Sequence, residues 1–195
     1  MHAFCYIKLP TKYPMKKYII IASVSIFSLF FQNCTSQNIT ENQNIVALTD
    51  SEEFTFHAER ANPTNYDVIN VMNSLPNAPS TRILQLQGQN YVIEMKKNQL
   101  AVILPYFGRV YNPSYGNSDG NSYRFVSKDF TVSKTQSKKG NSIFTIKPKD
   151  AKNVSDIYIE VYKNGKAFTS IKSNDRQPIT YDGYISKNEE TPKED

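Results

Sequence analysis

The sequence of 195 residues predicts one all-β domain, an antiparallel meander that closes into a small barrel of about eight to ten strands. Apolar and polar residues alternate in most stretches between 53 and 185, which is typical of strands with one buried face. Tight-turn sequences separate these stretches, so most strands that are neighbours in the chain should be neighbours in space. A long meander exposes two edges unless it closes, and we expect 179–185 to pair with 53–58. The alternative architecture is a two-sheet β-sandwich.

The expected strands follow from the spacing of their apolar residues. In the stretch 91–96, for example, Tyr91, Ile93 and Met95 share one face. The other expected strands cover 53–58, 81–87, 99–104, 122–126, 129–135, 142–147, 156–163, 166–172 and 179–185. Asn164-Gly165 lies between two of them and is the strongest hairpin signal, because both residue types tolerate positive φ.

One short helix is expected after the first strand. Asn62 would be its N-cap, and Pro63 would occupy its first helical position. Prolines at 76 and 79 would end it. The apolar residues that recur at steps of three are Tyr66, Ile69, Met72 and Leu75.

The N-terminal part of the chain has the pattern of a targeting segment. Residues 15–34, MKKYIIIASVSIFSLFFQNC, combine a charged start with an apolar run that is too short for an ordinary membrane span. This is the pattern of a secretory signal peptide. The remaining segments are interpreted as an upstream extension from a mis-set start codon (1–14), a polar tether (35–50), the single β domain (51–186) and a disordered charged tail (187–195).

Cys34 directly follows the apolar run, as the lipidated cysteine of a bacterial lipoprotein does. Its flank departs from the usual pattern, because Gln32 and Asn33 stand where small residues are usual. In this interpretation the mature chain begins at Cys34, and acyl chains anchor it to the outer or inner membrane of the cell envelope, facing the periplasm or the surface. The alternative is ordinary cleavage near CTSQ, which leaves Gln37 close to the N-terminus of a soluble secreted protein.

Composition argues against several classes of function. Residues 1–34 hold four of the 23 basic residues and none of the 18 acidic ones, so without them the formal charge falls from +5 to +1, and nucleic-acid binding is not expected. Both cysteines, Cys5 and Cys34, precede the domain, which excludes a disulfide or a catalytic thiol inside it. His57 is the only histidine of the domain and should point away from the core. We therefore expect no metal site and no cofactor.

The stretch LPYFGRVYNPSYG, 104–116, is the strongest candidate site. Pro105 should end the preceding strand, and Gly108 permits a tight turn. Aromatic residues at this density must cover either the core or a ligand. We expect the loop to fold over one end of the barrel, with Phe107 and at least one of Tyr106 and Tyr111 well buried. The candidate ligand or partner residues are Tyr106, Phe107, Arg109, Tyr111, Tyr115 and Arg176.

The two arginines of this set admit two interpretations. Each guanidinium could tie loop carbonyls or a carboxylate such as Asp182 at the barrel rim. Alternatively, Arg109 or Arg176 could bind an anionic ligand group through its planar fork, with the aromatic residues lining the apolar part of the pocket.

The stretch LPYFGRVYNPSYG resembles the signature of the Bacteroidota lipoprotein family of domain of unknown function 4251. The other stretches that fit the family are, in order, FTFHAERANP (54–63), YVIEMKKNQLAVILPYFGRVY (91–111), YRFVSKDFTVSK (123–134) and KNGKAFTSIKSNDRQPITYDGYI (163–185). The resemblance covers residues 51–186. It implies an exported, usually lipid-anchored, lipocalin-like β-barrel, and it implies no activity.

Three functions are compatible with the sequence. The first is a non-catalytic envelope lipoprotein whose barrel binds a small apolar or amphipathic ligand, or an envelope protein, beside the 104–115 loop. The second is a structural or protein-interaction module that acts through its surface alone. The third is a carboxylate-dependent hydrolase that would use two acids in one cleft, drawn from Glu94, Glu160 and Asp182.

Lipidation gives the first testable prediction. In cells fed a clickable fatty acid, the wild-type chain should be labelled and the Cys34→Ala variant should not, because the thiol is the acylation site. An unlabelled wild-type protein whose N-terminus maps near Gln37 would show instead that the signal is removed by ordinary cleavage.

Overall fold

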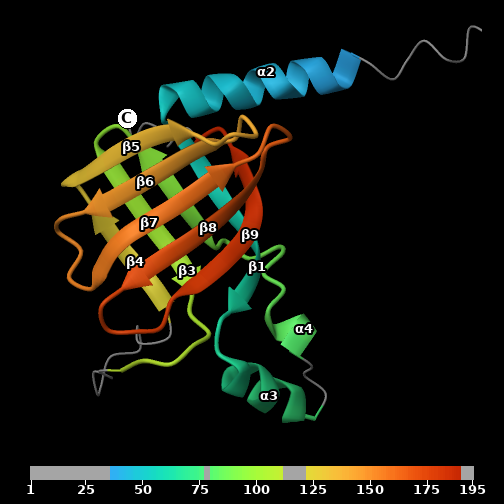
Figure 1. Cartoon of the computed structure of the whole chain (residues 1–195), viewed down its shortest axis with the longest axis vertical. Helices are drawn as coiled ribbons and strands as arrows, with labels where there is room; N and C mark the ends of the chain where they lie inside the picture. Colours follow the sequence, from blue (N-terminus) through green and yellow to red (C-terminus); the bar gives the residue numbers. More distant parts are fainter. Residues whose placement is uncertain (1–35, 77–79, 112–121, 190–195) are drawn as a thin grey trace, which may run out of the picture. The chain divides into compact units, whose positions relative to one another are not determined.

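The computed structural model describes residues 36–76, 80–111 and 122–189, and its centre is an antiparallel sheet of nine strands that curls into a nearly closed barrel (Figure 1). The chain divides into two compact units, 1–40 and 41–195, and the barrel belongs to the second. The strands are β1 (Phe54–Pro63), β2 (Val92–Lys96), β3 (Gln99–Pro105), β4 (Ser122–Ser127), β5 (Phe130–Gln136), β6 (Ser142–Pro148), β7 (Val154–Val161), β8 (Lys166–Ser173) and β9 (Ile179–Ser186).

The first and the last strand of the chain are neighbours in the sheet. The strand order is β4-β3-β2-β1-β9-β8-β7-β6-β5, and all paired strands run antiparallel. In the ladder between β1 and β9, Thr55 faces Ser186 at one end and Pro63 faces Ile179 at the other. The predicted all-β barrel and the expected pairing of its last strand with its first are therefore confirmed.

A seam remains between the two edge strands, β4 and β5. These strands are consecutive in the chain, yet they stand at opposite ends of the sheet order. Their connection is fixed from the neighbouring turn, since the backbone N–H of Lys128 donates to Oδ2 of Asp150 at 2.9 Å and Lys149 donates to the carbonyl of Asp129 at 2.8 Å. The β4–β5 connection is thus held against this turn, and the described residues form no ladder between the two strands.

The interior of the barrel is filled by its own side chains. Phe54 and Phe144 meet edge to face, with ring centroids 5.1 Å apart. The hydroxyl of Tyr181, the largest buried side chain, donates to the carbonyl of Pro105 at 2.6 Å, so its polar group is satisfied. The other large side chains with almost no accessible surface are Phe56, Leu86, Ile93, Met95, Leu100, Leu104, Ile146, Ile157 and Ile159. Each such residue contributes about 1.5–3 kcal/mol of hydrophobic stabilisation.

The prediction of a strand over 81–87 is wrong. The structure has a short helix, α4 (Ser80–Ile83), followed by a single bridge between Gln85 and Arg60. Leu84 and Leu86 are buried, as strand residues of one face would be. Two backbone hydrogen bonds to β1 hold this segment, because β2 leaves β1 after His57 and vacates that edge.

The predicted helix exists, but its N-cap is not Asn62. Helix α3 covers Tyr66–Ser74, and the side-chain oxygen of Asn65 accepts a hydrogen bond from the backbone N–H of Asp67 at 2.8 Å. Asn62 and Pro63 instead extend β1, because they lie opposite Thr180 and Ile179 of β9. Pairing with β9 therefore delays the start of the helix.

The segment expected as a polar tether is helical. Helix α2 covers Ser36–Ser51, and its last turns contact the barrel (Figure 1). The ammonium of Lys134 in β5 lies 2.8 Å from the carbonyl oxygen of Thr49 and 2.7 Å from Oδ1 of Asp50. A cation at the C-terminus of a helix satisfies free carbonyls and opposes the helix dipole. None of the helices in the described ranges is long and apolar enough to cross a membrane. The segments 1–14 and 15–34 lie outside the described residues, as does most of 187–195.

Gly183 in β9 allows the closest approach between the first and the last strand. It faces Ala58, next to a register shift between Ala58 and Arg60, and an added Cβ would collide with the carbonyl oxygen of His57. The obstacle is backbone, so no side-chain rotation can relieve it. The narrow spacing at this point therefore requires glycine.

We predict that Gly183→Ala lowers the free energy of unfolding by more than about 3 kcal/mol, because the closing ladder must separate locally. The control is Gly88→Ala, at a turn glycine with φ 78° and no atom near an added Cβ, which should cost only about 1–2 kcal/mol. Urea unfolding followed by circular dichroism measures both variants. Equal losses in the two proteins would show that β1 and β9 tolerate a wider spacing.

Candidate functional site

Two loops meet at one end of the barrel, the end at which β1 finishes. This end is called the rim. One is the β3–β4 loop, described over residues 106–111, and the other is the β8–β9 loop, 174–178. The backbone N–H of Tyr111 donates to the carbonyl of Asp175 at 2.7 Å, and that of Gln177 donates to the carbonyl of Arg109 at 3.0 Å. Val110 and Arg176 form a bridge between them. The two loops therefore extend each other as a short two-stranded ribbon.

Tyr106 fixes the turn of the LPYFGR stretch. Its side chain is only 5% exposed, and its hydroxyl lies 2.9 Å from the carbonyl oxygen of Arg109 and 3.0 Å from that of Gln177. An added Cβ on Gly108 would stand 2.6 Å from Cζ of the Tyr106 ring. The ring therefore occupies the space of a side chain at 108, which explains why glycine follows the two aromatic residues.

Arg176 joins the rim to the core. Its guanidinium lies 5.0 Å from the ring centroids of both Tyr106 and Tyr123, which pack edge to face. Nε and Nη2 donate to the two carboxylate oxygens of Asp175 at 3.1 and 3.0 Å, and Nη1 donates to the carbonyl of Ser122 at 3.2 Å. The side chains of this ion pair are only 11% and 13% exposed. All three nitrogens of the Arg176 guanidinium thus donate hydrogen bonds within the protein.

The electrostatics of this cluster favour the ion pair. Burial alone raises the pKa of the Asp175 carboxyl, but hydrogen bonds from Arg176 and Ser173 outweigh it and bring the pKa below its usual range. Burial likewise lowers the pKa of Arg176, while the hydrogen bonds and charge of Asp175 raise it above the usual value. Burial raises the pKa of both Tyr106 and Tyr123, so these phenols stay neutral beside the cation.

The outer side of the same ribbon faces solvent. Tyr111 is 57% exposed, the Arg109 side chain is exposed, and Phe107 is half-buried against the core. Phe107 is therefore less buried than expected, whereas the expected burial of at least one of Tyr106 and Tyr111 is confirmed by Tyr106. Tyr115 lies outside the described residues.

The arginines divide between the two interpretations. Arg176 has the structural role, with Asp175 as its carboxylate in place of Asp182. The carboxylate of Asp182 instead accepts a hydrogen bond from the side chain of Asn62 at 2.8 Å. Arg109 contributes its backbone to the ribbon and leaves its guanidinium at the surface.

His57 points to the outer face of β1, opposite to the core residues beside it, as the sequence predicted. It is half-buried there, because its ring stacks on Tyr184 with centroids 4.9 Å apart and its Nε2 lies 2.8 Å from Oγ of Ser186. Burial lowers the pKa of His57, and the charge of Glu189 opposes that shift in part. No cluster of three or more His, Cys, Asp or Glu that could hold a metal ion occurs in the described part of the chain.

The three carboxylates proposed for a hydrolase lie on the outer wall of the barrel. They occupy polar positions of β2, β7 and β9, between residues that point into the core. Each contacts a neighbouring side chain: Glu94 with Lys96 at 2.8 Å, Glu160 with Asn141 at 2.7 Å, and Asp182 with Asn62 at 2.8 Å. They do not line either of the grooves that flank α2.

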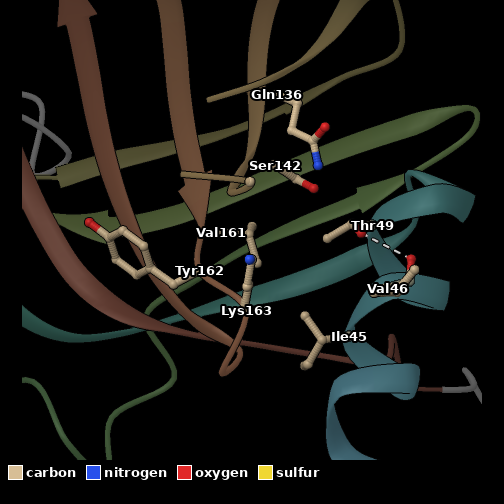
Figure 2. A pocket seen from close by; sticks show the side chains of 9 residues that line it. Ile45, Val46, Thr49, Gln136, Ser142, Val161, Tyr162 and Lys163 are labelled. Carbon is tan, nitrogen blue, oxygen red and sulfur yellow. Dashed lines mark hydrogen bonds between the residues drawn. The ribbon is translucent and has the colours of Figure 1, made fainter. Parts of the chain in front are cut away.

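A groove of about 330 Å³ runs between α2 and the adjacent end of the barrel, opposite to the rim (Figure 2). Helix α2 forms one side, and β5, β6 and β7 with their turns form the other. Its lining residues are Ile45, Val46, Thr49, Gln136, Gly140, Ser142, Val161, Tyr162 and Lys163. A second groove, of about 610 Å³, lies along another side of α2 and includes Glu53 and Lys187.

Comparison with known proteins identifies the family. The model of the family described as "Domain of unknown function (DUF4251)" matches residues 36–185. The chain belongs to the DUF4251 family. A search of curated proteins finds no match. Among solved structures, a DUF4251 family protein from Bacteroides eggerthii is similar, with 12% identity, a TM-score of 0.48, and coverage of 76% of this chain and 88% of that one.

Sequence reasoning missed that α2 belongs to the DUF4251 domain, because it placed the start of the domain at residue 51 whereas the family match begins at residue 36. The segment 36–51 is mostly polar, so its composition favoured a tether. The available signal was three apolar residues near the end of this segment, Ile45, Val46 and Leu48. They lie within one helical turn and could form an apolar helix face. The pairing of Arg176 with the residue directly before it could also have been considered from sequence.

We predict that the two arginines of this DUF4251 domain differ sharply in their effect on stability. Arg176→Met should lower the free energy of unfolding by about 2–4 kcal/mol, because it leaves the mostly buried Asp175 carboxylate without its cation. Arg109→Met should change it by less than about 0.5 kcal/mol. Thermal or urea unfolding tests the pair, and a larger loss for Arg109→Met would contradict these assignments.

Proposed function

We propose that this DUF4251 protein is an exported, non-catalytic protein of the cell envelope, anchored through an acylated Cys34, that binds an envelope protein through its rim loop. The rim loop is the solvent-facing side of residues 106–111. The proposal combines the signal pattern of the sequence with the form of the rim.

The observation that carries the proposal is the exposure of Tyr111 and Arg109 on a rigid base. The backbone of Arg109 and Tyr111 themselves is fixed by the ribbon and by the Tyr106 hydroxyl. Tyrosine and arginine dominate the energetic centres of protein interfaces. A loop that is already ordered loses little conformational entropy on binding, so its exposed anchors can contribute fully to affinity.

The filled interior favours a partner at the surface over a ligand inside the barrel. The core side chains leave almost no accessible surface, so an apolar molecule would have to displace them. The interior therefore supports the partner form of the first function. No observation favours the hydrolase.

The path of the chain also suits an anchored protein that uses this rim. The N-terminal segment reaches the barrel at the start of β1, beside Phe54, and the rim lies at the opposite end of that strand, beyond Pro63. The described chain just before β1 thus meets the barrel at the end away from Tyr111 and leaves the rim loop accessible to a partner.

Photo-cross-linking in living cells tests the partner site. With a photoreactive phenylalanine at Tyr111, we expect one discrete adduct with an envelope protein, and Arg109→Ala should weaken it. The matched control carries the same amino acid at Tyr184, a tyrosine on the outer wall that is 41% exposed. Absence of an adduct at position 111, or the same adducts from both positions, would overturn the proposal.

A further inference from the structure

We propose that the groove between α2 and the barrel end in Figure 2 binds a single-chain anionic amphiphile, such as a long-chain fatty acid. The alkyl chain would lie in the groove, and the lysines at its mouth would hold the acid group. This site is independent of the rim loop and lies at the opposite end of β1.

The groove has the size and lining of a small-molecule site. Its volume of about 330 Å³ falls at the lower end of the range of ligand sites, roughly 300–1,000 Å³. Ile45, Val46 and Val161 supply its apolar surface, and Val46 is 57% exposed in the structure. The hydroxyl of Thr49 is already bonded to the carbonyl of Val46 at 2.9 Å. Burying this apolar surface against an alkyl chain would be favourable.

The charge at the mouth of the groove is positive. Lys163 lines the groove and crosses the β5–β6 turn, where its Cε would stand 3.0 Å from an added Cβ on Gly140. Lys138 and Lys139 are exposed and directly precede that glycine. None of the described residues that line the groove is acidic. An apolar slot with lysines at one end complements an anionic amphiphile, whose charge and tail lie at opposite ends.

Carboxylates near the groove do not cancel this charge. Asp50 is bound to Lys134, at 2.7 Å. Glu160 accepts hydrogen bonds from Asn141 at 2.7 Å and from Tyr158 at 3.3 Å. The second groove beside α2 contains both Glu53 and Lys187, so its lining charges oppose each other and give no net attraction for an acid group. The charge pattern therefore selects the first groove.

The groove is too small to be a protein interface by itself. A stable interface buries about 800 Å² on each partner, which a slot between one helix and three strand ends does not provide. In Figure 2 the ring of Tyr162 points away from the groove, so its aromatic surface is not available there. One acyl chain is therefore the occupant that matches both the dimensions and the charge.

Titration of the purified full chain with monomeric palmitate tests the proposal, by displacement of a fluorescent fatty acid. We expect saturable binding with one site. Both Lys163→Glu and Val46→Glu should weaken it about tenfold or more, because they remove the cation or place an anion in the apolar wall. Both positions are exposed, so circular dichroism should show intact folds.

The matched control is Lys152→Glu, which makes the same charge change at an exposed lysine of the β6–β7 turn, outside the groove. Its palmitate affinity should equal that of the wild type. Three results would overturn the proposal: no palmitate binding by the wild-type chain, equal binding of the uncharged hexadecanol, or equal weakening by Lys152→Glu. Binding to anionic phosphatidylglycerol vesicles without binding of monomeric palmitate would likewise overturn it, by indicating a membrane-surface site.

Discussion

The pairing of the first strand with the last is the constraint on which the rest of the domain depends. The β1–β9 ladder sets the two ends of the barrel, because it runs from Thr55 opposite Ser186 to Pro63 opposite Ile179. At one end, the start of β1 brings in α2. At the other end, the start of β9 brings the β8–β9 loop next to the β3–β4 loop. Both the groove and the rim are consequences of this one antiparallel register, and the absence of a side chain at Gly183 permits it.

The six residues of the LPYFGR stretch both contribute to the core and expose a side chain, that of Arg109, to solvent. Its first half belongs to the fold, since Leu104 and Tyr106 are buried and Tyr181 bonds to the carbonyl of Pro105. Its second half turns outward at the glycine. Arg176 supports this turn from the β8–β9 loop. Its guanidinium packs against the rings of Tyr106 and Tyr123 and pairs with the carboxylate of Asp175, so it fills space beside the core while its donors remain bonded. The rim is therefore ordered without being apolar at its surface.

Much of the fold could be predicted from sequence, because alternation directly records which face of a strand is buried. The errors arose where tertiary pairing decided the outcome. Leu84 and Leu86 are spaced like residues on one face of a strand, yet their segment pairs with β1 through a single bridge and forms no strand. Two asparagines could have capped α3, and the extent of β9 excluded the first.

The candidate site was less predictable than the fold. The Tyr106 hydroxyl is satisfied in part by the carbonyl of Gln177, which lies about seventy residues away in the chain, a relation that no local pattern contains. The role of Arg176 depends in the same way on two distant rings, Tyr106 of the β3–β4 loop and Tyr123 of β4. For α2, the few apolar residues of 36–51 became informative only once the barrel end that they cover was known.

The seam between β4 and β5 gives the barrel an uneven resistance to local opening. Every other named strand is held by ladders on both sides, whereas each of these two is held by one. Free energies of opening follow such connectivity, so native-state amide exchange should be slowest in β1 and β9 and fastest beside the seam. Lys134 of β5 also bonds to the end of α2. The edge strand with the weakest backbone pairing is therefore one that holds the helix in place. Local opening at the seam would therefore also disturb the position of α2, because Lys134 connects β5 to the end of that helix.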